Sequence, residues 1–442
     1  MKTSLLQCCF LLFIFSFYSQ ASKPNILFIF ADDQCYETIR ELGLTDIDTP
    51  HLDQLMNSGT SFTRAYNMGS WSGAVCVASR HMLNTGRFIW QAQEASNKAE
   101  EERISGRWWS EYMKKAGYKT YMTGKWHVRA KAEKCFDVVR NLRGGMPNQT
   151  PEGYNRPISD KPDPWSPYDP KFGGFWKGGK HWSEVVADDA LYFFDEAKKH
   201  QDENPFFAYI AFNAPHDPRQ APKSYIDRYP LDRIEVPTSF LPEYPYKEEI
   251  KCPHNLRDEK LAPMPRTTHS IKVNRQEYYA IITHMDEQIG KIISGLQKSG
   301  MEKNTYIFFS ADHGLGVGHH GLLGKQNLYD GSWRVPMILA GPGVPKGETR
   351  PGLAYLHGLY PTLASLAGLE APKYTHPFEF ASVIRGDSQG LDRVFGAYMP
   401  NVKVPNGVRA VREGEWKLLY YTHSGRKQLF NLKNDPWETN DL

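Results

Sequence analysis

The chain contains little cysteine: 6 residues among 442, two of them at positions 8 and 9 in an N-terminal apolar run. The other cysteines, Cys35, Cys76, Cys135 and Cys252, are far apart and show no CxxC or CxxxC spacing, which argues against a disulfide framework or a cysteine-rich zinc site. We expect Cys35, Cys135 and Cys252 to be small buried apolar residues, although one pair could still form a disulfide. Cys76 needs a separate explanation.

The sequence also lacks a strong charge of one sign and a long apolar run after its N-terminus. Its net charge is +3, which gives no reason to expect a nucleic acid partner. No later segment approaches about 18 uncharged apolar residues, so no membrane span is expected. Lys2, the apolar residues 5–18 and the small residues Ser19 and Ala21 are typical of a secretory signal. We predict that residues 1–21 are a signal peptide and that the protein is periplasmic or secreted.

Helical and strand-like patterns alternate along most of the chain. Residues 26–31 form a continuous apolar run, as in a strand that is buried on both faces of a parallel sheet. A helical pattern follows at 49–59, and further helix–strand pairs lie within 107–127, 182–216 and 275–314. This order predicts an α/β fold with a large, mostly parallel sheet flanked by helices.

The pattern changes near residue 375, where short segments begin to alternate like antiparallel strands. We predict a main, catalytic domain over 22–374 and a smaller C-terminal α+β subdomain with an antiparallel sheet over 375–442. Within the main domain, residues 128–181 and 217–272 are long, weakly periodic and rich in Pro, Gly, Trp and Tyr. Loops of this length in an enzyme usually form substrate walls or lids.

Acidic side chains follow two of the predicted strands. Asp32 and Asp33 end the first apolar run, and Asp312 and His313 end a later one. Open α/β sheets bind ligands at this carboxyl edge, and adjacent carboxylates repel each other unless a cation or proton holds them. One such pair could be a solvated turn, but two favour a metal site. Carboxylates favour Ca²⁺ or Mg²⁺, while His313 also suits Mn²⁺ or Zn²⁺.

Cys76 lies where a glycine- and serine-rich loop meets a predicted helix, in GSWSGAVCVASRHM. The positive end of a helix dipole favours anions, and Arg80 would lie on the same face one turn later. Two further predicted strands end near Lys125, His127 and His216. A buried structural thiol is the simple alternative for Cys76.

Several segments, in order along the chain, resemble the motifs of one enzyme family. CVASR at 76–80 resembles the C-x-P-S-R signature of sulfatases. The other similar segments are PNILFIFADDQ at 24–34, GKWH at 124–127, APH at 214–216, SADHG at 310–314, GKQNLYDGSWRVPMI at 324–338 and LFNLKNDPWETNDL at 429–442. The sequence is therefore similar to the type I, formylglycine-dependent sulfatases of the alkaline phosphatase superfamily, and most to bacterial polysaccharide sulfatases.

The resemblance implies that a maturation enzyme converts Cys76 to Cα-formylglycine. The hydrated aldehyde would offer one hydroxyl to attack sulfur and a second whose deprotonation expels sulfate. The resemblance also implies a Ca²⁺ site, with Mg²⁺ or Mn²⁺ as alternatives, formed by Asp32, Asp33, Asp312 and His313 together with the modified residue 76. The commonest family pattern has Asn at the position of His313, which leaves the identity of the metal open.

The same resemblance implies roles for the other polar residues of these motifs. Lys125 and Lys325 match positions that hold sulfate and neutralise charge in the transition state. His127 matches the base that takes the second diol proton, and His216 matches the residue near the leaving alcohol, a candidate general acid. Arg80 would hold the diol oxygens or neutralise charge near them.

We expect an exported sulfatase that releases inorganic sulfate from a sulfated carbohydrate in polysaccharide degradation, with a marine galactan such as carrageenan as one candidate. Trp126, His319 and His320 are candidates for substrate contacts. Ala78 stands where aerobic maturation enzymes generally prefer proline. A phosphonate or phosphodiester hydrolase of the same superfamily is one alternative, and a sulfoglycan-binding protein that has lost catalysis is another.

Overall fold

The computed structural model describes residues 23–148, 150–158, 161–201, 203–250, 252–398 and 407–442. The predicted signal peptide, residues 1–21, lies outside these ranges. None of the helices in the described part of the chain combines the length and the apolarity that a membrane crossing requires. The four cysteines at 35, 76, 135 and 252 are all buried and free, so the disulfide left open by the sequence does not form among them.

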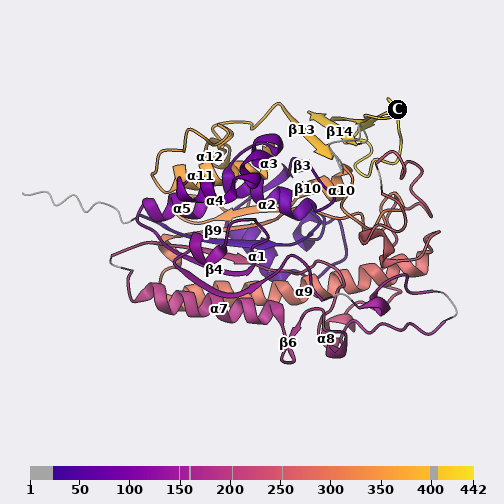
Figure 1. The fold of residues 1–442 in the computed structure, drawn as a ribbon, viewed down its shortest axis with the longest axis horizontal. Coiled ribbons are helices and arrows are strands. Elements are labelled where there is room, and N and C mark those ends of the chain that lie inside the picture. Colours follow the sequence, from indigo (N-terminus) through magenta and orange to yellow (C-terminus); the bar gives the residue numbers. More distant parts are fainter. Residues whose placement is uncertain (1–22, 149, 159–160, 202, 251, 399–406) are drawn as a thin grey trace, which may run out of the picture.

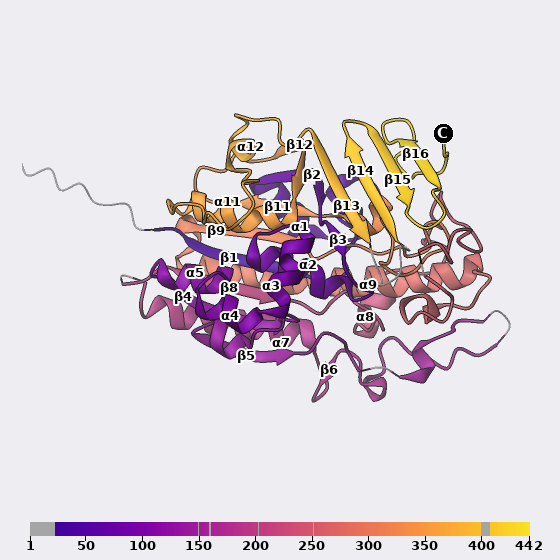
Figure 2. The same ribbon diagram turned by 45° about the horizontal axis from the view of Figure 1, so that its top comes forward.

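A large sheet forms the centre of the molecule, in the order β10-β2-β11-β9-β1-β8-β4-β5, with β12 paired to β2 (Figures 1 and 2). The strands are β1 (Asn25–Ala31), β2 (Thr60–Tyr66), β4 (Lys119–Lys125), β5 (Val138–Arg143), β8 (Phe206–Ala211), β9 (Thr305–Ala311), β10 (Arg334–Val335), β11 (Met337–Ala340) and β12 (Glu348–Tyr355). Strands β9, β1, β8, β4 and β5 are mutually parallel, whereas β11 is antiparallel to β9 and β2. The predicted, mostly parallel sheet is therefore confirmed.

Helices cover both faces of the sheet. The side chains of β1 from Ile26 to Ala31 are all apolar, so both of its faces have to be buried. Leu27 and Ile29 point into a core that includes residues of α1 (Pro50–Ser58), α7 (Trp182–Lys198) and α9 (Thr268–Ser299). Ile26 and Phe28 point the other way, toward α5 (Trp109–Lys115) and α11 (Leu359–Leu366). Figure 1 shows α7 and α9 side by side along one face. The other helices are α2 (Val75–Thr85), α3 (Ile89–Asn97), α4 (Ala99–Ile104), α6 (Ala132–Cys135), α8 (Lys223–Ile226), α10 (Asp330–Trp333) and α12 (Ala381–Arg385).

A second sheet contains the C-terminal strands, in the order β16-β15-β14-β13-β3 (Figure 2). Its strands are β13 (Arg393–Tyr398), β14 (Val408–Glu413), β15 (Trp416–Tyr421) and β16 (Lys427–Asn431), joined by the short β3 (Gly69–Ser70). The pairs from β13 to β16 are antiparallel, as the sequence predicted. The sequence did not indicate β3, which pairs in parallel with β13 and lies just before the helix that carries Cys76.

Buried ion pairs join the second sheet to the first. Lys417 and Arg412, from β15 and β14, contact the Asp330 carboxylate at 2.8 and 3.2 Å, and Lys417 also lies 2.6 Å from Glu438. The Tyr66 hydroxyl at the end of β2 donates to Asp330 as well, at 3.1 Å. Removing one member of such a buried network leaves an uncompensated charge, which typically costs about 3–5 kcal/mol.

Gly124 allows β4 to lie close to β8 just before Lys125. Its φ is +84°, and an added Cβ would lie 1.8 Å from the carbonyl oxygen of Ala211. Gly117, in the turn before β4, has a similar φ of +88° but faces open space. The two glycines share the same backbone conformation and differ in the room around them.

We therefore expect Gly124→Ala to lower the free energy of unfolding more than Gly117→Ala. The left-handed conformation alone should cost about 1 kcal/mol in either variant, and the clash with β8 should add roughly 1–3 kcal/mol in Gly124→Ala only. Urea unfolding followed by circular dichroism measures both. Equal losses in the two variants would contradict the close approach of β4 and β8.

Candidate active site

The carboxyl ends of neighbouring parallel strands bring the predicted metal ligands together. Asp32 and Asp33 follow β1, and Asp312 and His313 follow the adjacent β9, with Ala31 and Ala311 paired in register. The Asp33 backbone N–H donates to Asp312 Oδ1 at 3.0 Å, and His313 Nε2 lies 3.0 Å from Asp33 Oδ1. All four side chains are fully buried.

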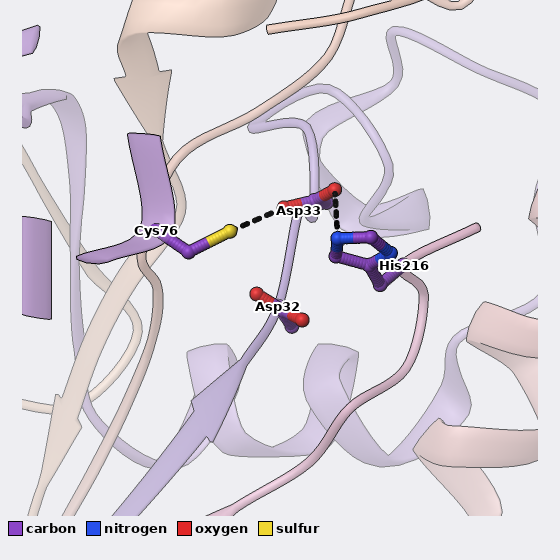
Figure 3. A group of neighbouring side chains, drawn as sticks. All are labelled: Asp32, Asp33, Cys76 and His216. Atoms are coloured by element: carbon purple, nitrogen blue, oxygen red, sulfur yellow. Dashed lines mark hydrogen bonds and ion pairs between the residues drawn. The ribbon is translucent and has the colours of Figure 1, made fainter. Parts of the chain in front are cut away.

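Cys76 lies in the first turn of α2, as predicted, and it faces these strand ends. Its Sγ is 3.1 Å from Lys325 Nζ, 3.3 Å from His313 Nε2 and 3.6 Å from Asp33 Oδ1. Figure 3 shows Cys76 and His216 on opposite sides of the two aspartates at 32 and 33. Residue 76 thus lies where the positive end of a helix meets a group of charged side chains.

The charges around Cys76 favour a negative group at its position. Burial raises the pKa of the thiol, but Lys125, Lys325 and His313 outweigh burial, so that the pKa lies well below its ordinary value. Cationic neighbours are the usual cause of a low thiol pKa. The side chain of Cys76 is only 3 % exposed.

Arg80 holds the strand ends in place from one turn further along α2. Its Nε lies 3.0 Å from Asp312 Oδ2 and its Nη2 lies 3.4 Å from Asp32 Oδ1. Nη1 donates to the Lys125 backbone oxygen at 2.7 Å. Arg80 is fully buried, and these three contacts connect α2 to the ends of β9, β1 and β4. These contacts put its positive charge beside Asp32 and Asp312, and its predicted role toward the diol oxygens stays a prediction.

The two lysines implied by the resemblance each contact one aspartate. Lys125 Nζ pairs with Asp32 Oδ2 in a short contact, and Lys325 Nζ lies 2.9 and 3.0 Å from the Asp33 oxygens. Burial raises the pKa of Asp32 well above its ordinary value, and Lys125 offsets this only in part. Lys325 Nζ also lies 3.2 Å from His216 Nε2.

His313 and Asp312 stabilise each other's charged form. Burial lowers the pKa of His313, but Asp312 and Asp33 more than compensate and raise it to about 9. Burial raises the pKa of Asp312, while His313 and Arg80 hold it below its ordinary value. A charged histidine cannot bind a metal through the protonated nitrogen, so a cation at this site would displace a proton from His313.

The donor set fits a divalent cation. Two groups of four side chains have ligand atoms that all lie within 4.8 Å of one another. They are Asp32, Asp33, Cys76 and His216, and Asp33, Cys76, Asp312 and His313. Buried carboxylate oxygens with one imidazole suit Ca²⁺, Mg²⁺ or Mn²⁺. The sequence did not indicate that His216 would lie so close to the metal ligands.

His127 lies beside Cys76 at the end of β4, with a φ of +54°. Its ring packs against Gly145, where an added Cβ would lie 2.2 Å from Nε2. Burial lowers the pKa of His127, which keeps the ring neutral and able to accept a proton.

Trp126 does not fit the substrate contact expected of it. Its indole is 5 % exposed, belongs to the core beneath the sheet and donates from Nε1 to the Ala130 oxygen at 2.7 Å. The alternation of side chains at the strand end turns this residue inward. His319 Nε2 donates to the Glu37 carboxylate at 3.1 Å, and His320 stacks on Tyr329. Both rings therefore have protein partners, and their contact with substrate stays a prediction.

The sequence analysis missed two residues next to His216. No sequence motif includes Asp217. Its backbone oxygen lies 2.8 Å from His216 Nδ1, and its carboxylate pairs with Arg257 at 2.5 Å. The adjacency of Asp217 to the APH motif was the available signal. Arg257 lies in the aperiodic segment 217–272, where no pattern distinguishes it.

Comparisons with known proteins agree with this geometry. The sulfatase family model matches residues 24–369, and the C-terminal model of N-sulphoglucosamine sulphohydrolase matches residues 318–442. An arylsulfatase of Clostridium perfringens is 26 % identical over 460 residues, which cover 95 % of this chain and 90 % of that protein.

Two solved structures show the same fold. Ps i-CgsB in complex with k-i-k-neocarrahexaose has a TM-score of 0.66 at 24 % identity, covering 95 % of this chain and 88 % of that one. The phosphonate monoester hydrolase SpPMH of Silicibacter pomeroyi has a TM-score of 0.73 at 20 % identity, covering 93 % and 90 %. Since the sulfatase model spans most of the main domain and both site lysines, the chain belongs to the sulfatase family of sulfuric ester hydrolases.

Proposed function

We propose that this protein removes sulfate from a sulfated carbohydrate with a nucleophile made from Cys76. The observation that supports this proposal is the position of Cys76 Sγ, 3.1 Å from Lys325 Nζ and 3.3 Å from His313 Nε2, at the edge where three buried carboxylates meet. A structural thiol needs no cationic neighbours, whereas a group that attacks an anionic ester does.

Conversion of Cys76 to Cα-formylglycine would supply a hydrated aldehyde as the attacking group. Lys125 and Lys325, both buried beside residue 76, would bind the sulfate oxygens and stabilise the charge that develops on them. His127, neutral and next to residue 76, would take the proton whose removal releases sulfate. His216 Nε2 accepts from Lys325 Nζ at 3.2 Å, so His216 would first take up a proton there and then donate it to the leaving oxygen.

A divalent cation, with Ca²⁺ as the first choice and Mg²⁺ or Mn²⁺ as alternatives, would be held by Asp32, Asp33, Asp312 and His313 and would polarise the ester. Charge supports this arrangement. In their ionised forms the three carboxylates would balance Arg80, Lys125 and Lys325, which contact them. His313 is a fourth cation, and a bound metal would displace its proton. A divalent cation would then leave the site positive by two charges, which matches the charge of the sulfate product.

A carbohydrate is the substrate class that the relatives and the loops favour. Ps i-CgsB, which has the same fold, was crystallised with k-i-k-neocarrahexaose, so a galactan such as carrageenan is one candidate. The long segments 128–181 and 217–272 lie between the site residues along the chain, and they would provide walls for such a substrate. We further propose export to the periplasm or the medium and a formylglycine-generating maturation enzyme as partner.

The likeness to SpPMH favours a phosphonate or phosphodiester hydrolase as the second candidate, because the two chains share the fold over nine-tenths of their lengths. The match to the sulfatase family model favours the first candidate, a sulfatase. A protein that binds sulfoglycans without cleaving them is the third candidate, and it requires that Cys76 stays unconverted.

Matched substrates separate these candidates. Protein coexpressed with a maturation enzyme should release sulfate from a panel of sulfated sugars and from an aryl sulfate, with kcat/KM at least about 100-fold above that for the matched aryl phosphonate and phosphate diester. Cys76→Ala should lose at least about 1000-fold of this activity. Faster cleavage of the phosphonate would support the second candidate and reject the sulfatase proposal.

The state of residue 76 can be read directly. Mass spectrometry of the peptide that contains it should show the aldehyde after coexpression with a maturation enzyme and cysteine without it. Ala78→Pro should increase conversion by an aerobic enzyme, and the helix should tolerate it because the Ala78 N–H makes only a 3.5 Å bond to the Ala74 oxygen. Unconverted cysteine together with full activity would contradict the proposed nucleophile.

Metal binding has a readout that does not depend on activity. After chelation, added Ca²⁺ should raise the Tm, because saturation to 100 times Kd stabilises a folded protein by about 2.7 kcal/mol. Asp312→Asn should abolish the shift. Asp286→Asn is the matched control, since Asp286 is equally buried but caps α1 through the N–H groups of His51 and Leu52. A shift that survives Asp312→Asn would place the cation elsewhere.

A further inference from the structure

A polar chain runs along one side of the Cys76 site and reaches beyond the groups described so far. Gln326, the neighbour of Lys325, donates from Nε2 to the Gly73 oxygen at 3.1 Å, in the loop before α2. The same Nε2 donates to Asp258 Oδ2 at 2.7 Å. Asp258 in turn pairs with Nη2 of Arg257. Arg257 is therefore connected to the loop that carries the nucleophile.

Arg257 is also connected to the histidine near the leaving group. Its Nη1 donates to Asp217 Oδ2 at 2.5 Å. Asp217 Oδ1 lies 3.4 Å from His216 Nδ1, and His216 Nε2 lies 3.2 Å from Lys325 Nζ. Because both ends of this chain of contacts return to the sulfate site, Arg257 lies on its rim, on the side where the leaving alcohol would be.

The guanidinium of Arg257 is fixed but still open to a ligand. The side chains of Asp217 and Asp258 are 1 % and 4 % exposed, whereas that of Arg257 is 27 % exposed. A guanidinium carries five N–H donors, so two carboxylate contacts leave donors for a substrate. An arginine that is already held in one position loses little conformational entropy when it binds.

The charge around Arg257 favours a neutral partner. Two buried carboxylates flank this one guanidinium, and burial lowers its pKa less than Asp217 and Asp258 raise it, so it stays charged. A hydroxyl group could accept from Arg257 and donate to a carboxylate. A second sulfate offers acceptors only and would be repelled by both carboxylates.

We propose that Arg257, held by Asp217 and Asp258, forms a subsite for a free hydroxyl on the sugar that carries the scissile sulfate, and that the enzyme therefore selects monosulfated over disulfated sugars. This inference rests on the proposed sulfatase function, of which it specifies the substrate. Asp217 and Asp258 act as positioning residues in it, and Arg257 touches the substrate.

Deoxy analogues of the monosulfated sugar that the wild-type enzyme desulfates provide the test. Each analogue lacks one hydroxyl. For one of them, kcat/KM of the wild type should be about 10- to 100-fold lower than for the complete sugar, as expected for the loss of a hydrogen bond to a charged group. Arg257→Ala should cleave the two sugars at equal rates, and Arg257→Lys should restore only part of the difference. Arg426→Ala, which removes an exposed arginine paired with Glu249, should behave as the wild type.

This comparison distinguishes recognition from indirect damage. A displaced His216 or a less stable fold would lower activity on both sugars equally and leave their ratio unchanged, which would overturn the inference. Retention of the wild-type Tm in Arg257→Lys would show that the fold is intact. If the wild type releases no sulfate from any compound, the proposed function fails, whereas an unchanged ratio in Arg257→Ala rejects this subsite alone.

A second sulfate on the same sugar gives an independent measurement. The wild type should prefer the monosulfated sugar by at least about tenfold in kcat/KM. Asp258→Asn removes one of the two negative charges that would repel a second sulfate, so it should reduce the ratio of kcat/KM for the monosulfated over the disulfated sugar. A wild-type enzyme that prefers the disulfated sugar would contradict the inference, because a pocket selective for a second anion needs excess positive charge.

Discussion

The burial of three carboxylates at one edge of the sheet is the constraint on which the rest of the site depends. Asp32, Asp33 and Asp312 have no exposed surface, and unpaired charges in such a position cost several kcal/mol each. Arg80 and Lys125 compensate two of them through direct contacts. Arg80 lies on the helix that carries Cys76 and pairs with Asp32 and Asp312, so these ion pairs hold that helix against the sheet.

The second, C-terminal sheet also helps to position a residue of the site. Lys325 lies in a segment that continues into α10, and Asp330 at the start of α10 is bound by Lys417 and Arg412 of the second sheet. Tyr329, beside Asp330, donates to Gln428 of β16 at 2.8 Å. The lysine that contacts both Asp33 and Cys76 is therefore positioned by residues nearly a hundred positions later in the chain. The two sheets act together at the active site.

The sequence was sufficient for the fold class and for the main residues of the site because their signals are local. Continuous apolar runs predicted buried parallel strands, and polar residues at the ends of these runs had to meet at one edge. The motif around Cys76 and Arg80 placed both on one face of a helix start, which the structure confirms. Each of these features depends on fewer than about ten consecutive residues.

The rest depends on contacts between distant segments. The pairing of β3 with β13 joins two residues to a strand more than three hundred positions away, and no periodicity marks so short a strand. Trp126 was expected to contact substrate, yet its ring packs into the core just after β4. Arg257 lies in an aperiodic loop, and only the three-dimensional path through Asp217 and Asp258 shows its relation to the site.

The burial of Cys76 also has a consequence for the timing of synthesis. The proposed maturation enzyme could not reach a side chain that is 3 % exposed and lies 3.1 Å from Lys325 Nζ. Strand β3 ends five residues before Val75 and, within the described residues, pairs only with β13. Of the described strands, only β14, β15 and β16 follow β13 in the chain. Until β13 has been synthesised, β3 has no strand to pair with. The proposed conversion of Cys76 would therefore have to come before the fold is complete, because the folded structure buries the side chain.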